Sequence, residues 1–206
     1  MSDVVAVIDY GMGNLHSAGK ALEKVASGQQ IVITGDPDQV RAADRVVFPG
    51  VGAIRDCIAV LRDTGLDRAI LDVIAAGKPV LGICVGMQLL AETGREDGAT
   101  PGLEWIGGEV SRIQPGEGLR VPHMGWNDVT PGSGRVLFDA LDEDPRFYFL
   151  HSYYVEPAEQ SDVAATAHYG FDFACAIHRD NVWGVQFHPE KSHHFGAAVL
   201  KSFAEL

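Results

Sequence analysis

The first 90 residues alternate short apolar runs with stretches of helical periodicity, and this alternation limits the chain to few folds. Four apolar runs have the length and composition of buried strands: 4–8, 31–34, 45–48 and 79–81. Four stretches are expected to be helical: 15–25, 54–63, 66–75 and 87–92. Residues 35–38, which read Gly-Asp-Pro-Asp, are expected to form a turn. Elements in this order predict a mostly parallel sheet with helices on both faces.

Beyond residue 94 the pattern changes, because strands dominate and glycine and proline become frequent. The expected strands are 108–113, 147–150, 163–168, 174–178 and 182–187. The last two are expected to form a hairpin around Asp180-Asn181, and a final helix is expected at 195–203. No internal repeat or long linker interrupts the chain, so we expect a single domain over residues 1–206. Its expected fold class is α/β, with a mostly parallel central sheet and added antiparallel strands in the C-terminal half.

The composition excludes several classes of protein. With 206 residues, of which 46% are hydrophobic, the chain can bury a substantial core. Its formal net charge of -12 argues against nucleic-acid binding, because phosphates require a cationic surface. No apolar run is long enough to span a membrane, and the first residues lack the basic and apolar form of a signal peptide. We therefore expect a soluble, cytoplasmic protein without a membrane segment.

One cysteine stands at an unusual place, where the apolar run at 79–81 leads into a helix. The stretch 82–86, which reads Gly-Ile-Cys-Val-Gly, has the form of a nucleophile elbow with sulfur in place of oxygen. The glycines permit a sharp turn that lifts Cys84 out of the sheet, and the helix N-terminus favours a thiolate. The alternative is a buried structural cysteine, which is a common role for a free thiol. Cys57 and Cys175 are expected in the core, and the spacing of the three fits no metal site.

A cysteine nucleophile needs a base, and the chain offers His188 directly after its last apolar strand. Proline limits the backbone that follows, and at a spacing of two residues the Glu190 carboxylate can reach back to the imidazole. Taken in isolation, His-Pro-Glu is also typical of an ordinary turn beside a solvated carboxylate. His123 and His151 are expected in loops, and the other histidines on helix faces or strand edges. His188 is therefore the preferred base.

In an open α/β sheet, ligands bind at the carboxyl ends of the strands. We therefore expect four segments to converge there: 9–14, 49–52, 84–86 and the residues after 187. The backbone N–H of Val85 and the loop 49–52, with Gly52, are candidate donors to a developing oxyanion. This loop lacks the lysine of a phosphate-binding loop, and His16 replaces the third glycine of a dinucleotide motif in 11–16. A nucleotide site is not expected.

The stretch 82–88, Gly-Ile-Cys-Val-Gly-Met-Gln, together with 186–190, Gln-Phe-His-Pro-Glu, resembles the class I (triad) glutamine amidotransferases. The resemblance extends over the whole chain, and the order of cysteine, histidine and glutamate agrees. It implies the three-layer fold of that family and hydrolysis of L-glutamine to glutamate and ammonia, without a metal or other cofactor. Cys84 would attack the carboxamide, His188 would transfer protons and Glu190 would orient His188. The family more often has leucine at the position of Val85, but only the backbone N–H is needed there.

Four further motifs resemble one branch of that family, the glutaminase subunits of imidazole glycerol phosphate synthases. They are Tyr-Gly-Met-Gly-Asn-Leu at 10–15, Pro-Gly-Val-Gly at 49–52, Pro-His-Met-Gly-Trp-Asn at 122–127 and His-Pro-Glu-Lys-Ser at 188–192. This branch implies a heterodimer with a (β/α)8-barrel cyclase subunit. The cyclase receives ammonia through a protected channel and makes imidazole glycerol phosphate and AICAR in histidine biosynthesis. The positions that match the docking face are Asn14, His123, Met124, Trp126, Tyr148 and Lys191.

The resemblance also implies a pocket that holds the glutamine substrate. Its expected residues are Gln88 and the segment His151-Ser152-Tyr153, with Gly50 and Gly52 close to the substrate backbone. Without the resemblance, Trp126 and Tyr148 would be expected in the core, because isolated aromatic residues usually lie there. Lys191 would be a solvated charge, and Ser152 would cap a turn.

Two other functions stay open at this point. A class I glutaminase that serves another synthase, such as that of vitamin B6 synthesis, would share the fold and the triad, although the run at 122–127 argues against it. A catalytically dormant interaction module would keep the fold without the chemistry. The presence of cysteine, histidine and glutamate at all three triad positions argues against such a module.

Overall fold

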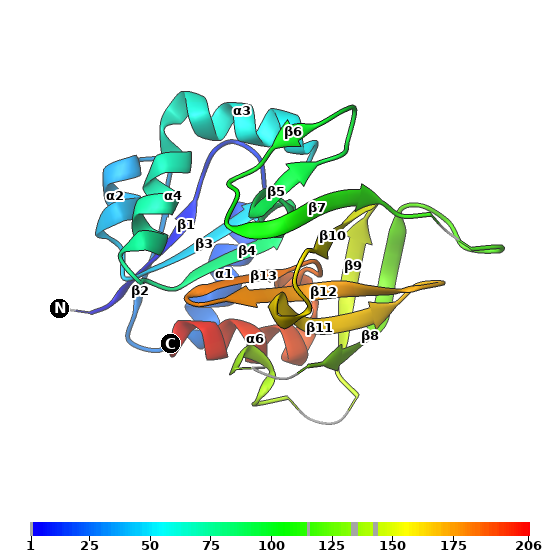
Figure 1. The fold of residues 1–206 in the computed structure, drawn as a ribbon. Helices are drawn as coiled ribbons and strands as arrows, with labels where there is room; N and C mark the ends of the chain where they lie inside the picture. Colours follow the sequence, from blue (N-terminus) through cyan, green and yellow to red (C-terminus); the bar gives the residue numbers. More distant parts are fainter. Residues whose placement is uncertain (1, 115, 133–135, 142–143) are drawn as a thin grey trace.

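Five parallel strands form the first part of a mixed sheet in the computed structural model, which describes residues 2–114, 116–132, 136–141 and 144–206. Their order is β2-β1-β3-β4-β13 (Figure 1). Their bounds are β1 Val4–Ile8, β2 Gln30–Thr34, β3 Arg45–Gly50, β4 Val80–Cys84 and β13 Val182–Val185. Strands β4 and β13 are buried along their whole length, because helices cover both faces. The four strands predicted in the first 90 residues are confirmed, with small shifts at their ends.

Helices cover both faces of these parallel strands. Their bounds are α1 Leu15–Val25, α2 Pro37–Ala42, α3 Ile54–Thr64, α4 Leu66–Ala75 and α6 His193–Ala204. Helices α1 and α6 pack together on one face, and α2, α3 and α4 lie on the other (Figure 1). The helices predicted at 15–25, 54–63, 66–75 and 195–203 are confirmed to within two residues at each end. None of the helices in the described ranges combines the length and apolarity needed to cross a membrane.

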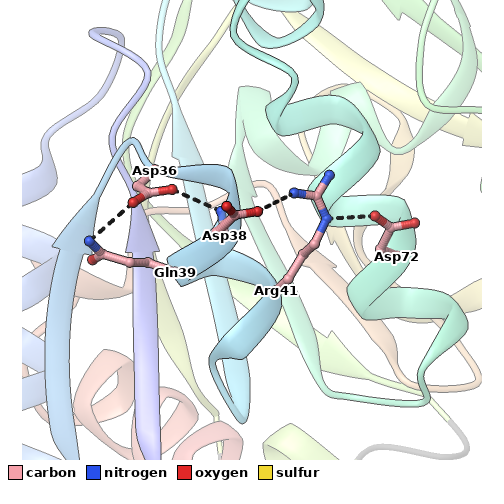
Figure 2. A network of polar contacts seen from close by, with 5 residues as sticks. All are labelled: Asp36, Asp38, Gln39, Arg41 and Asp72. Carbon is pink, nitrogen blue, oxygen red and sulfur yellow. Dashed lines mark hydrogen bonds and ion pairs between the residues drawn. The ribbon is translucent and has the colours of Figure 1, made fainter.

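The predicted turn at 35–38 is instead the beginning of helix α2. Asp36 is its N-cap, and the Asp36 carboxylate accepts a hydrogen bond of 2.9 Å from the Asp38 N–H. Arg41, in the last turn of α2, bridges Asp38 at 3.0 Å and Asp72 of α4 at 2.7 Å, and Figure 2 shows these three side chains together. Aspartate followed by proline is a signal for a helix start as well as for a turn, and here the contact with α4 favours the helix.

The helix predicted at 87–92 is wrong at both ends. Helix α5 covers only Val85–Leu89, and the chain then enters a short strand, β5, at Ala91–Gly94. The reason is a long-range contact: the N–H groups of Gly102 and Leu103 donate to the carbonyls of Glu92 and Leu89. Hydrogen-bond partners that lie ten or more residues away do not affect the local periodicity. The sequence alone therefore does not predict where the helix ends.

Antiparallel pairing dominates the second half of the chain, apart from the β5–β7 and β4–β13 pairs. The remaining strands are β6 Thr100–Pro101, β7 Ile106–Arg112, β8 His123–Pro131, β9 Arg146–His151, β10 Tyr153–Pro157, β11 Val163–His168 and β12 Asp172–Arg179. The predicted strands of this half are confirmed to within two residues, as is the β12–β13 hairpin. Strands β5, β6, β8 and β10 are not among the predictions. His123 and His151 are not in loops, because they face each other across the β8–β9 ladder.

Parallel strands place their carboxyl ends at one edge of the sheet, and four of them end near the predicted nucleophile. Strand β3 pairs with β4, and Gly50 lies directly opposite Cys84. Strand β13 pairs with β4 on the other side, with Val185 opposite Ile83. The segments after β1, β3, β4 and β13 therefore begin at the same edge, which is where α/β sheets bind ligands.

Candidate active site

Cys84 lies at the junction of β4 and α5, with a backbone conformation that few side chains adopt. Its φ is 57° and its ψ is -112°, and the residue is 4% exposed. The flanking glycines are required by close packing. A Cβ on Gly82 would lie 2.6 Å from the Gly86 carbonyl oxygen, and a Cβ on Gly86 would overlap the carbonyl of Phe48. The turn after β4 therefore has the geometry of a nucleophile elbow.

His188 and Glu190 form a hydrogen-bonded pair at the end of β13. The His188 Nδ1 and Glu190 Oε1 atoms are 2.9 Å apart, and the two side chains are 5% and 3% exposed. The backbone supports the pair, since the His188 N–H donates to the Tyr148 carbonyl at 2.9 Å. Burial lowers the pKa of His188, but the Cys84 sulfur and the Glu190 carboxylate outweigh it and raise the pKa to about 9. The predicted reach of Glu190 back to the imidazole is confirmed.

A cavity of about 370 Å³ opens at this edge of the sheet. The residues predicted for the site that line it are Asn14, Gly52, Cys84, Val85, Gln88, Ser152, Tyr153, His188 and Lys191. Gly50 and Glu190 are not among the lining residues. Gly50 pairs with Cys84 across the β3–β4 ladder, and Glu190 is hydrogen-bonded to His188. The cavity is therefore bounded by the loops after β1, β3, β4 and β13 on one side, and by the segment between β9 and β10 on the other.

Gln88 is tied into a buried amide network, and this places it at the base of the cavity. Its Nε2 donates to the Tyr153 carbonyl and to Gln186 Oε1, each at 3.0 Å. Gln186 Nε2 in turn lies 3.7 Å from Cys84 Sγ. Sequence reasoning did not assign Gln186, although it stands two residues before His188. An amide directly after a buried strand that reads Val-Trp-Gly-Val is the signal that could have identified it.

The loop after β3 is held by a second thiol. The Cys57 Sγ lies 3.4 Å from the Val51 carbonyl oxygen, to which it donates. Burial raises the pKa of Cys57 to about 11, so this sulfur keeps its proton. Gly52 has a φ of 100°, which favours glycine. Because a trans peptide directs its N–H opposite to its carbonyl, the Gly52 N–H points away from Cys57.

Glu96 is a cavity residue that sequence reasoning missed. It follows strand β5, and its Oε2 accepts the Ile54 N–H at 3.0 Å, which anchors it at the beginning of α3. Its carboxylate is the acidic group among the residues that line the cavity. The wrong prediction of a helix over 87–92 is the reason, because a helix that continues to residue 92 would place Glu96 in a loop away from Cys84.

The surface beside the cavity carries most of the residues assigned to docking. Met124 is 65% exposed and Trp126 is 41% exposed, so Trp126 is not a core residue. The Trp126 ring packs edge-on against half-buried Tyr148, with ring centroids 6.2 Å apart. Lys191 Nζ lies 5.8 Å from the centroid of the Tyr148 ring. Asn14 is exposed at the rim of the cavity.

His123 is the exception among the docking residues. It is only 3% exposed, because its ring stacks between Phe149 and Tyr169 with centroid distances of 4.8 Å and 4.0 Å. Its neighbours Met124 and Trp126 lie on the opposite, exposed face of β8. The expectation that the His123 side chain belongs to the docking face is therefore corrected: His123 lies beneath that face.

The other two thiols lie outside the cavity. Cys57 and Cys175 are fully buried, and burial also raises the pKa of Cys175. Cys57 packs on the inner face of α3, as its spacing with Ile54 and Leu61 predicts. Across the residues that the structure describes, no group of three or more histidine, cysteine, aspartate or glutamate side chains is arranged to hold a metal ion.

Full-length relatives share about half of the residues of this chain. The chain is 48% identical over 202 residues to the imidazole glycerol phosphate synthase subunit HisH of Acinetobacter baylyi, with 98% of this chain and 97% of that protein covered. It is 51% identical over 200 residues to the subunit of the same name from Nitrosococcus oceani, with 97% and 95% covered.

Solved structures agree in fold at low sequence identity. A structure of PurLQS from Thermotoga maritima superposes with a TM-score of 0.77 at 20% identity, over 100% of this chain and 99% of that chain. A glutamine amidotransferase crystal structure gives a TM-score of 0.74 at 16% identity, over 98% and 99%. The family model "Glutamine amidotransferase class-I" matches residues 6–205. This chain therefore belongs to the class I glutamine amidotransferase family, whose α/β fold it shares.

Proposed function

We propose that this chain is the glutaminase subunit of an imidazole glycerol phosphate synthase. The observation that carries the proposal is that Cys84 and His188 line one cavity while Glu190 is hydrogen-bonded to His188, in a chain of this family. The name shared by its relatives supports the choice of branch. The reaction would release ammonia from L-glutamine for a cyclase subunit.

In the first half of the reaction, the Cys84 sulfur attacks the side-chain carbonyl carbon of glutamine. The backbone N–H groups of Val85 and Gly52 stabilise the oxyanion that develops on the carbonyl oxygen. His188, which the raised pKa keeps protonated near neutral pH, gives its proton to the departing nitrogen. The C–N bond breaks, ammonia leaves, and a glutamyl thioester with Cys84 remains.

In the second half, water hydrolyses the thioester. His188, now neutral, takes a proton from the water as it attacks the thioester carbonyl. The C–S bond breaks, glutamate leaves and the Cys84 sulfur is restored. Glu190 holds the His188 ring through Nδ1 at 2.9 Å in both halves, which leaves Nε2 for the proton transfers. The base therefore keeps one orientation while its charge changes.

Glutamine would be held by the wall opposite Cys84. Ser152 and Tyr153 line the cavity, and Gln88 lies at its base. We assign the Glu96 carboxylate to the substrate ammonium group, since it supplies the negative charge of the cavity wall. Gly50 has no room for a side chain, because a Cβ there would lie 2.5 Å from the Tyr10 hydroxyl.

The partner would dock over the mouth of the cavity. Met124 and Trp126 present apolar surface there, and Lys191 and Asn14 lie both at the cavity rim and in the predicted docking set. Exposed aromatic and methionine side chains are typical of interface centres. A cyclase subunit seated on this face would cover the cavity, so that ammonia passes between the subunits and not into water.

We take residues 1–206 to form one domain, because one hydrogen-bonded sheet path connects β2 at one edge with β6 at the other. A cytoplasmic location stays a prediction from the sequence.

The test is glutamine turnover by the full chain alone, with the (β/α)8 cyclase subunit, and with that subunit and its nucleotide substrate. We expect weak turnover by the chain alone and an increase of at least about tenfold in the loaded complex. Turnover that responds only to a different synthase, for example that of vitamin B6 synthesis, would contradict the assignment. So would the absence of turnover in all three mixtures.

A further inference from the structure

A pair of buried histidines lies outside the residues that carry the chemistry. His123 of β8 and His151 of β9 face each other in the strand ladder, and are 3% and 5% exposed. The His123 Nδ1 and His151 Nε2 atoms are 2.9 Å apart. His151 also lines the cavity. Two imidazoles in direct contact have few compatible protonation states, so their partners define their arrangement.

The hydrogen bonds around the pair run in one direction. The Tyr153 carbonyl oxygen accepts only, so His151 Nδ1, at 2.8 Å, carries a proton. In a neutral ring His151 Nε2 is then an acceptor, and His123 Nδ1 must donate to it. His123 Nε2 accepts from Asn127 Nδ2 at 3.3 Å. Asn127 Nδ2 also donates to the His168 carbonyl at 2.8 Å, which fixes the orientation of that amide.

Burial and packing keep the pair in this state. Burial disfavours the charged form and lowers the pKa of His123 to about 4 and that of His151 to about 3. Both rings are therefore neutral at physiological pH. The stacking of His123 between Phe149 and Tyr169 leaves its ring no room to turn.

This series of hydrogen bonds leads to the wall of the proposed glutamine pocket. The Tyr153 carbonyl that accepts from His151 also accepts from Gln88 Nε2 at 3.0 Å. Gln88 continues through Gln186 to the neighbourhood of the Cys84 sulfur. The other end of this series of hydrogen bonds is Asn127 on β8, the strand that carries the exposed docking residues.

We propose that His123 and His151 are a positioning pair for glutamine binding, which sets the backbone of residues 151–153 relative to strand β8. This inference rests on the proposed function. The pair touches no reacting atom. It orients the Tyr153 carbonyl and, with it, the segment of Ser152 and Tyr153, two residues that line the cavity. Because β8 also carries the docking residues, a partner seated there contacts the strand that holds the pocket wall in place.

The test compares His123→Phe with wild type, each as a full chain with the cyclase subunit present. Phenylalanine keeps a flat ring between Phe149 and Tyr169 but removes the donor, and leaves His151 Nε2 without a partner. We expect the KM for glutamine to rise about tenfold, the effect of one lost hydrogen bond, with kcat changed less than about twofold. His123→Gln keeps an N–H donor, and its KM should lie between the two.

His178→Phe is the matched control. His178 also stacks on an aromatic ring, that of Trp183 at 4.7 Å, and also contacts a backbone carbonyl, that of Asp180 at 2.8 Å. It does not line the cavity. Its KM and kcat should equal those of wild type. A fall in activity of the same size in both variants would mean general destabilisation and would overturn the positioning role.

Two further outcomes separate this inference from the proposed function. A wild-type complex that does not hydrolyse glutamine would refute the proposed function. Normal wild-type turnover with an unchanged KM in His123→Phe would refute the positioning role alone. If His123→Phe does not fold, nitrogen NMR of the wild-type imidazoles decides. Protons on Nδ1 of both His123 and His151 at pH 7 support the pair, and a proton on His151 Nε2 overturns it.

Discussion

The parallel and antiparallel parts of this sheet make different contributions to one cavity. The parallel strand β4 ends at Cys84, β13 ends three residues before His188, and helices cover both strands on both faces. The antiparallel strands β8, β9 and β10 supply the opposite wall and the surface around the mouth. The proposed reacting groups thus lie on the part that helices cover on both faces, whereas the proposed substrate and partner contacts lie on the part with an exposed face. Substitutions in the first part should change kcat, and those in the second should change KM or partner affinity.

The largest effect is expected at the end of β4. Cys84→Ala removes the nucleophile and should lower glutamine turnover by about 10⁴-fold or more, because no other group can form the thioester. The fold should be retained, and circular dichroism with thermal unfolding checks this. Cys175→Ala removes a buried thiol outside the cavity and serves as the control. Normal turnover by Cys84→Ala would contradict the proposal that glutamine reacts at the carboxyl edge of the parallel strands.

The next effect concerns stability and pH. The pKa of His188 is raised from about 6.5 in the unfolded chain to about 9 in the folded chain. The folded state therefore gains stability that is fully present below about pH 6.5 and is lost as the pH rises through about 9. The expected loss is on the order of 3 kcal/mol, measured by urea unfolding between pH 6 and pH 10. His188→Asn should remove this part of the pH dependence. An identical pH profile in wild type and variant would show that the folded protein does not favour the charged imidazole.

A smaller effect is expected on the antiparallel side. Trp126→Ala removes an exposed aromatic side chain from the predicted docking face, and should weaken binding of the cyclase subunit by about ten- to a hundredfold. Ile33→Ala, on the edge strand β2, removes a comparably exposed apolar side chain and should leave the Kd unchanged. Titration calorimetry measures both. Equal Kd values for the two variants would place the docking face elsewhere.

The smallest effect is expected at the surface of the parallel part, far from its carboxyl edge. Arg41→Ala breaks the bridge between α2 and α4 that Figure 2 shows, but the partners Asp38 and Asp72 are 92% and 59% exposed. Exposed ion pairs contribute little, so the free energy of unfolding should fall by less than about 1 kcal/mol. A loss above about 2 kcal/mol would mean that this network holds α2 on the sheet.

The parallel part could be predicted closely because its signals are local. Buried parallel strands are continuous apolar runs. The glycines around Cys84 indicate a sharp turn, in which close backbone packing leaves no room for a Cβ. The contact between His188 and Glu190 also follows from their spacing, since proline limits the two-residue segment. The class of fold and the sharp turn at Cys84 could therefore be predicted from the sequence.

The antiparallel part was predicted less well because its signals are distant. Strand β8 alternates between exposed and buried residues and pairs with β9 and β11 across long gaps in the chain. The burial of His123 depends on Phe149 and Tyr169, which lie far along the chain. Glu96 reaches the cavity only because α5 ends after one turn. No local pattern encodes contacts of this kind.

The central claim is that Cys84, and neither of the other thiols, reacts with glutamine at this edge of the sheet. The direct test is to treat the complex with a glutamine analogue that carries an electrophilic ketone in place of the amide, and to map the modified cysteine by mass spectrometry. We predict one added group, on Cys84, with protection by excess glutamine. Cys57 and Cys175 should stay unmodified, since both are buried outside the cavity. Modification of either of them, or none at Cys84, would contradict the account.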